Sequence, residues 1–93
     1  MDVENFRNSL RKKHEVFLQF TGEAREVYLA GEFNNWEPKL KFERQGERFV
    51  LQTELFAGIY PYKLVVDGRW ILDANAAVMI APNGEKNSRL VVE

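Results

Sequence analysis

Lys63 and Trp70 are two side chains that could do chemistry together, because they stand on either side of a predicted turn. The turn is Asp67-Gly68, and Asp-Gly between two apolar runs is a strong signal for a two-residue β-hairpin. In that register Val65 pairs with Trp70 and Lys63 with Leu72, so Lys63 lies diagonally from Trp70 on the same face. An exposed indole beside an ammonium group therefore predicts a binding surface.

The same register predicts which face of the hairpin is buried. The face with the larger apolar run should form core: Tyr60, Tyr62, Leu64, Val66 and Ile71. The outer face should carry Lys63, Val65, Trp70 and Leu72. An alternative stays open, in which a helix at 3–12 or the long segment 73–87 covers Trp70.

Apolar and polar residues alternate with a period of two along most of the chain, which predicts about seven short strands. The predicted strands cover 16–20, 27–29, 40–42, 49–55, 59–66, 69–72 and 88–92. Turn signals between them favour an all-β fold, a small antiparallel β-sandwich. Pro61 cannot donate to a ladder, so we expect it at an edge or a bulge. The connection 73–87 is long for so small a domain and should pack across one end of the sandwich, and a short strand within it stays an open alternative.

The first residues follow a different period. Val3, Phe6 and Leu10 recur at helical spacing and predict a short N-terminal helix over 3–12. We therefore divide the chain into a helical extension, 1–13, and a β-sandwich domain, 14–93. The basic run at 11–14 could suggest nucleic acid, but a solvated helix end explains it better.

Composition excludes several classes of protein. The 93 residues contain no cysteine, so disulfide scaffolds, thiol chemistry and cysteine zinc sites are excluded. The 13 Lys and Arg residues balance 14 Asp and Glu residues, and the net charge of −1 gives no overall attraction to nucleic acid or anionic membranes. No secretory signal and no membrane-spanning run is visible, so a cytoplasmic location is the default expectation.

Three motifs follow one another in the sequence: VYLAGEFNNW at 27–36, YKLVVDGRWILD at 62–73 and NSRLVV at 87–92. In the first motif, Asn34-Asn35 suit a turn with positive φ. In this order and spacing the three motifs resemble the family-48 carbohydrate-binding modules, in particular the glycogen-binding domain of the AMP-activated protein kinase β subunit. The resemblance covers roughly 14–93. Modules of this family also precede the catalytic domains of branching and debranching enzymes such as isoamylase.

The resemblance implies an early-set, immunoglobulin-like β-sandwich that binds α-1,4-linked glucans such as glycogen and starch. Trp36 and Trp70 match the tryptophans that stack on glucose rings. Lys63 and Asn87 match the residues that hydrogen-bond sugar hydroxyls. The last loop departs from the kinase subunit, because Asn83 and Glu85 stand where that subunit has Leu and Thr.

An enzyme is not expected, because no motif defines a catalytic cleft. Asp67 and Asp73 are the obvious candidates for catalytic carboxylates, but a role in the turn explains Asp67. His14 is the only histidine and has no neighbouring ligand pattern, so neither a metal nor a cofactor is expected. The alternative function is a protein-interaction module of the same fold. Beyond glucan, the expected partners are an enzyme of glycogen metabolism or a second copy bound through the N-terminal helix.

Overall fold

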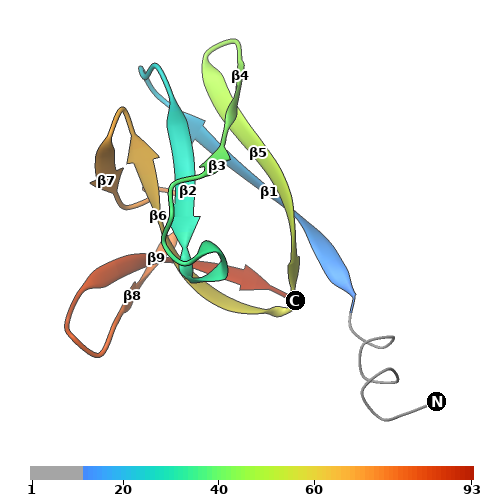
Figure 1. The fold of residues 1–93 in the computed structure, drawn as a ribbon, viewed down its shortest axis with the longest axis vertical. Coiled ribbons are helices and arrows are strands. Elements are labelled where there is room, and N and C mark those ends of the chain that lie inside the picture. The colour runs from blue at the N-terminus through green and yellow to red at the C-terminus, as the bar shows by residue number, and fades with distance from the viewer. Residues whose placement is uncertain (1–11) are drawn as a thin grey trace.

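The computed structural model describes residues 12–93, which form antiparallel β-strands and one short 3-10 helix (Figure 1). The elements are β1 (Lys13–Thr21), β2 (Val27–Gly31), η1 (Glu32–Asn34), β3 (Leu40–Lys41), β4 (Glu43–Gln45), β5 (Arg48–Phe56), β6 (Gly58–Val66), β7 (Arg69–Ile71), β8 (Ala77–Ile80) and β9 (Lys86–Val92). The helix predicted over 3–12, and with it most of the predicted extension 1–13, lies outside the described residues.

The strands form two sheets. The smaller has the order β1-β5-β4, and the larger has the order β3-β2-β6-β9-β8, with β7 also paired to β6. Every pairing is antiparallel. Figure 1 shows the paired long strands β1 and β5 beside the larger sheet, with the β8–β9 hairpin projecting from it.

The hydrophobic core lies between these two sheets. The larger sheet contributes Val27, Leu29, Tyr62, Leu64 and Val66, and the smaller contributes Phe49 and Leu51. Phe42 joins them from the segment between β3 and β4. Because apolar groups from both sheets are removed from water together, each sheet stabilises the other. The predicted all-β, antiparallel sandwich is confirmed for the described residues.

The Asp67-Gly68 hairpin has the predicted register, with Val65 opposite Trp70 and Val66 opposite Arg69. Both turn residues have positive φ, 49° and 81°, as a turn that follows the twist of the strands requires. Val65 is nevertheless buried on the predicted outer face, because it pairs with Trp70 on one side and with Tyr28 on the other.

One strand differs from the sequence prediction, and another was left open by it. The single strand expected at 40–42 is split: β3 belongs to the larger sheet and β4 to the smaller. The chain changes sheets at Phe42, whose ring is buried and whose N–H donates to the Val27 carbonyl over 2.8 Å. Part of the long connection 73–87 forms β8, which pairs with β9 along Ala77–Ile80.

Pro61 lies inside β6, which is not an edge strand. However, the pairing of β6 with β2 ends at Tyr62, and from Gly58 to Pro61 the strand pairs only with β9. Pro61 is therefore at a local edge, where its missing N–H removes no ladder bond on the open side.

Candidate functional site

A pocket of about 390 Å³ opens on the outer face of the larger sheet. The four residues predicted from the sequence all line it: Trp36, Lys63, Trp70 and Asn87. Three residues of the loop between β8 and β9 complete the lining: Ala81, Asn83 and Glu85. The fold therefore brings together side chains from three separate motifs.

Lys63 occupies a seam in the sheet. On one side of β6, β9 pairs as far as Tyr62 opposite Ser88, and β7 takes over from Leu64 opposite Ile71. Lys63 lies between these two pairs, so the expected pairing of Lys63 with Leu72 does not form. Its neighbours across the seam are Trp70 of β7 and Asn87 of β9, which explains how strands far apart in sequence share one pocket.

Trp70 and Asn87 meet solvent in different ways. Trp70 is 48% exposed, so the segment 73–87 does not cover it. Asn87 is only 6% exposed, yet its side-chain amide makes no hydrogen bond to another residue within 12–93. In the described part of the chain, every fully buried side-chain nitrogen or oxygen atom has a hydrogen-bond partner. Because the Asn87 amide has none, it is not fully buried and reaches solvent, on the side that lines the pocket. An amide in that position offers both donors and an acceptor to a ligand.

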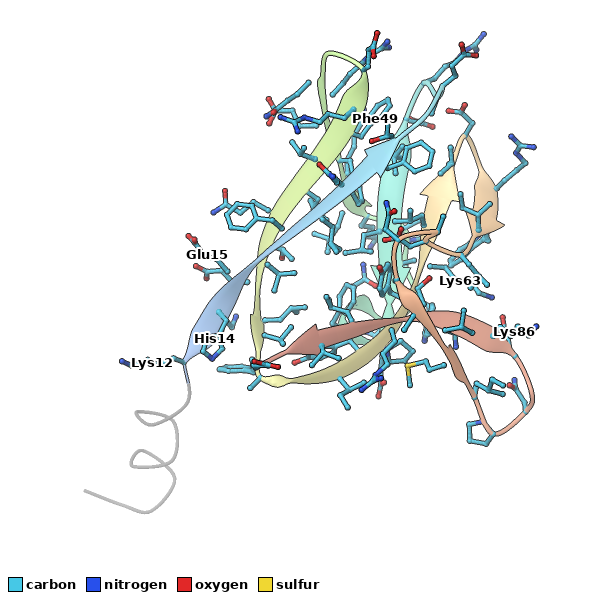
Figure 2. All side chains as sticks on the ribbon, turned by 180° about the vertical axis from the view of Figure 1, so that it is seen from behind. Lys12, His14, Glu15, Phe49, Lys63 and Lys86 are labelled. Carbon is cyan, nitrogen blue, oxygen red and sulfur yellow. The ribbon has the colours of Figure 1, made fainter. Side chains whose placement is uncertain are left out.

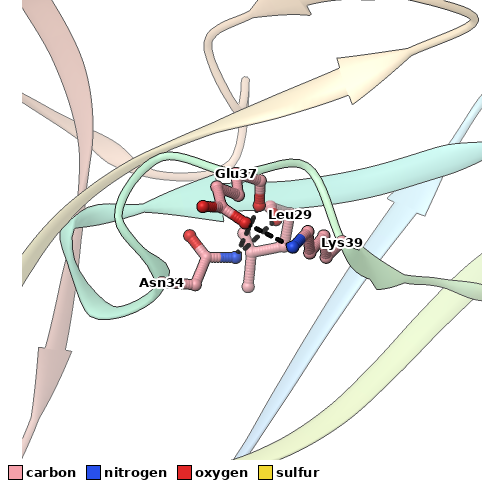
Figure 3. A network of polar contacts seen from close by, with 4 residues as sticks. All are labelled: Leu29, Asn34, Glu37 and Lys39. Atoms are coloured by element: carbon pink, nitrogen blue, oxygen red, sulfur yellow. Dashed lines mark hydrogen bonds and ion pairs between the residues drawn. The ribbon is translucent and has the colours of Figure 1, made fainter.

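Trp36 is held by the tight turn that follows β2. Asn34 braces this turn, because its Oδ1 accepts from the Gly31 N–H over 2.9 Å while its Nδ2 donates to the Leu29 and Glu37 carbonyls over 3.2 and 2.9 Å. Figure 3 shows the two donated bonds and the exposed ion pair of Lys39 with Glu37 beside them. The Trp36 N–H closes the turn on the Gly31 carbonyl over 2.8 Å.

The backbone at Trp36 is strained. Asn35 and Trp36 both have left-handed φ values, 58° and 59°, whereas the sequence suggested this conformation for Asn34 and Asn35. Left-handed φ is uncommon for a bulky residue and costs on the order of 1–3 kcal/mol, so it persists only where the surroundings enforce it. The Asn34 hydrogen bonds supply that enforcement and fix the backbone that carries the Trp36 indole.

The loop from Ala81 to Glu85 forms the remaining wall. Its backbone is closed by the Ala81 N–H donating to the Glu85 carbonyl and the Gly84 N–H donating to the Ala81 carbonyl, both over 2.8 Å. The Glu85 N–H also donates to Asn83 Oδ1 over 3.0 Å. At the end of the loop, Glu85 Oε1 accepts a hydrogen bond from Lys63 Nζ over 2.5 Å. This hydrogen bond and the Lys63 charge hold the pKa of the Glu85 carboxyl below its usual range.

The chain is similar to known proteins over nearly its whole length. The family described as the glycogen recognition site of AMP-activated protein kinase matches residues 14–93. The chain belongs to this family. The resemblance read from the three motifs is confirmed, and so is membership of a carbohydrate-binding family.

Several relatives of this glycogen recognition domain are kinase subunits. The β-1 subunit of the 5'-AMP-activated protein kinase from Sus scrofa is 38% identical over 93 residues, which are 99% of this chain and 75% of that protein. The human β-1 subunit is 37% identical over 92 residues, again 99% of this chain. The chain spans 34% of the human subunit, and the same share of the β-1 subunit from Rattus norvegicus.

A solved structure supports the fold of the glycogen recognition domain. The crystal structure of a maltogenic amylase from S. marinus superimposes with a TM-score of 0.72, covering 88% of this chain and 14% of the amylase. At 22% identity this likeness shows the fold alone.

The two carboxylates considered as catalytic candidates have structural partners in this glycogen recognition domain. Asp67 Oδ1 accepts from the Glu26 and Arg25 N–H groups over 3.0 and 2.9 Å, and these two bonds lower the pKa of its carboxyl. Asp73 is buried and accepts a hydrogen bond from the Tyr62 hydroxyl over 2.7 Å. The pKa of Tyr62 is raised mainly by burial of its own side chain and also by this hydrogen bond. Both carboxylates thus brace loops, and neither lines the pocket.

His14 lies at the exposed start of β1, well away from Lys63 (Figure 2). Residues 12–93 contain no group of three His, Cys, Asp or Glu side chains placed to hold a metal ion. In that same part of the chain no helix is long and apolar enough to cross a lipid bilayer.

Proposed function

We propose that this domain binds α-1,4-linked glucans such as glycogen and starch and performs no chemistry on them. One observation supports this most strongly: the pocket joins two indoles, Trp36 and Trp70, to the hydrogen-bonding groups of Lys63 and Asn87. The domain belongs to a family of glycogen recognition sites, and its sandwich matches the fold of part of an amylase.

The chemistry of glucose fits these residue types. A glucose ring has C–H groups on its faces and hydroxyls around its rim. The flat indoles of Trp36 and Trp70 offer apolar area and a negative π-face to the C–H groups. The Lys63 ammonium donates to rim hydroxyls, and the Asn87 amide both donates and accepts. In this proposal the tryptophans supply most of the binding free energy, and the two polar groups fix the orientation of the sugar.

The affinity should be modest. The glucan is flexible and well hydrated, so ordering it and stripping water from its hydroxyls offset much of the stacking gain. We expect a Kd between about 1 mM and 1 μM, which corresponds to roughly −4 to −8 kcal/mol. A polymer with many equivalent segments raises the effective affinity when several such domains bind it together.

The wider role of the domain is also a proposal. Since the chain spans about a third of several of its relatives, we propose that it brings a partner enzyme of glycogen metabolism to glucan in the cytoplasm. The immunoglobulin-like, early-set class of the sandwich and a second copy docked through a helix at 3–12 stay predictions.

Retention on glycogen tests the binding function, using the wild-type protein, Trp36→Ala and Trp70→Ala. We expect each variant to lose at least about tenfold in affinity for glycogen, because each loses one stacking surface. Phe17→Ala is the matched control, because Phe17 is 69% exposed on β1, outside the pocket, and its loss should leave binding unchanged. Circular dichroism confirms that each variant is folded.

Two outcomes would contradict the proposal. Equal retention of the wild type and both tryptophan variants would mean that binding occurs elsewhere. No retention of the wild type would favour the alternative of a protein-interaction module that has kept the sandwich without binding sugar.

A further inference from the structure

We propose that Glu85 makes this pocket selective for neutral glucans over glucans that carry phosphate esters. This inference rests on the proposed function and assigns a specificity-determining role to a residue outside the predicted binding set. The observation behind it is the hydrogen bond that the Lys63 ammonium donates to the Glu85 carboxylate.

The geometry gives Glu85 access to a ligand. Its side chain is 56% exposed and lines the same pocket as the two tryptophans, so a bound sugar that contacts Lys63 also meets this carboxylate. The Lys63 side chain is only 17% exposed, and its ammonium is directed to Glu85 Oε1. The Asn83 side chain accepts from the Glu85 N–H over 3.0 Å and fixes the backbone from which the carboxylate extends.

The charge balance follows from this contact. Among the seven residues that line the pocket, Lys63 is the one cation and Glu85 the one anion, so the lining is electrically neutral. A phosphate ester bound here gains attraction from Lys63 and suffers nearly equal repulsion from Glu85, while it still loses its hydration. Anionic glucan therefore gains nothing over neutral glucan.

The carboxylate also serves a neutral sugar directly. An ionised carboxylate is an acceptor, and it complements the Lys63 ammonium, which only donates. With one ammonium proton directed at Glu85, the lysine side chain is held in place before the sugar arrives, which lowers the ordering cost of binding. Glu85 thus favours hydroxyl groups and disfavours phosphate at the same position.

The test compares two ligands on wild-type protein and on Glu85→Gln. The ligands are maltoheptaose and maltoheptaose phosphorylated on several C6 hydroxyls, so that every binding register places a phosphate near the pocket. Tryptophan fluorescence gives the Kd of each. We expect the wild type to bind the neutral sugar at least as tightly as the phosphorylated one. Glu85→Gln leaves Lys63 unneutralised and should shift the ratio of the two Kd values by about fivefold toward the phosphorylated sugar.

Two further measurements separate charge from structure. Raising the salt concentration should reverse the shift in Glu85→Gln and leave the wild-type ratio unchanged, because only the variant has an uncompensated cation in the pocket. Glu47→Gln is the matched control, since it removes an exposed carboxylate in the β4–β5 turn, outside this pocket, and should leave the ratio unchanged.

The outcomes distinguish this inference from the function on which it rests. If the wild type binds maltoheptaose and Glu85→Gln leaves the ratio of Kd values unchanged, or Glu47→Gln shifts it equally, the role of Glu85 is wrong and glucan binding stands. If the wild type binds neither sugar, the proposed function fails and the selectivity fails with it.

Discussion

The two loops that frame the pocket are built very differently. The turn that carries Trp36 is braced by a side chain, since Asn34 makes hydrogen bonds to Gly31, Leu29 and Glu37. The loop from Ala81 to Glu85 is closed by two backbone bonds, one contact to Asn83 and the exposed ion pair to Lys63. The first loop rests on the core strand β2, and the second tips the projecting β8–β9 hairpin.

This contrast means that one wall of the pocket is rigid, whereas the residues of the other wall can change more freely. The Trp36 turn holds a strained backbone that only dense bracing can maintain, so its residues are tightly constrained. The β8–β9 loop tolerates changes of side chain, because its conformation depends mainly on backbone bonds. In the proposed function, the stacking surface of Trp36 comes from the rigid wall, and the proposed ligand selectivity is adjusted on the other wall. Four substitutions or titrations test this comparison.

Gly31→Ala should have the largest effect. A Cβ at this position would lie 2.6 Å from the Phe33 ring and 2.8 Å from the backbone carbonyl oxygen of Pro61. The ring can move, but the carbonyl belongs to β6 and cannot, so the strand and the turn must separate. We expect a loss of about 2–3 kcal/mol in the free energy of unfolding, measured by urea denaturation. A loss below about 0.5 kcal/mol would show that the turn is not closely packed.

Asn34→Ala should be the next largest. It removes three hydrogen bonds, to the Gly31 N–H and to the Leu29 and Glu37 carbonyls, two of them in a partly buried position. We expect a loss of about 2 kcal/mol in unfolding free energy, together with weaker maltoheptaose binding, because Trp36 loses its support. Lys39→Ala is the control, since it removes the exposed ion pair beside this network and should cost less than about 0.5 kcal/mol. Equal losses of unfolding free energy in the two variants would show that Asn34 does not brace the turn.

Gly84→Ala tests the second loop and should cost less. Gly84 has a φ of 86°, a conformation that residues with a side chain seldom adopt, but an added Cβ would meet nothing within 4 Å. The cost is therefore confined to the local backbone, and we expect about 1 kcal/mol in the same urea experiment. A loss as large as that of Gly31→Ala would contradict the difference between the two loops.

The smallest effect should be the pH dependence of the Lys63–Glu85 pair. Because the pKa of Glu85 is lowered in the folded state, the pair stabilises the fold above the ordinary glutamate pKa of 4.5. That stabilisation is lost as the pH falls through the lowered value. The difference in Tm between wild type and Glu85→Gln should therefore be constant near pH 7 and shrink toward pH 3. A difference that does not change with pH would mean that the pair contributes nothing to stability.

Local signals in the sequence predicted one half of the site well. The Asp67-Gly68 turn fixes the hairpin register by its own backbone geometry, and that register places Lys63 and Trp70 on one face. The tight turn before Trp36 was also expected, although its positive φ values fall one residue later than predicted. The roles of the four lining residues in sugar binding stay predictions.

Long-range pairing decided what the sequence left open. The alternation at 40–42 is the same whether one strand continues or two strands separate, and the pairing of β3 with β2 and of β4 with β5 decides between them. The strand β8 depends on its pairing with β9, since its four residues are an apolar run with no alternation of polar and apolar side chains. The contact between Lys63 and Glu85 joins residues 22 positions apart, and no local pattern predicts it.

The seam at Lys63, where β9 gives way to β7 beside β6, has a consequence for how this domain can diverge. The spacing of the backbones that carry Lys63, Trp70 and Asn87 is set by strand pairing, about 4.8 Å per strand, and not by the side chains themselves. The lining can therefore be exchanged residue by residue while the frame keeps its dimensions. Domains built on this frame should differ in which modified sugars they accept, and should agree in how far apart their contacts lie.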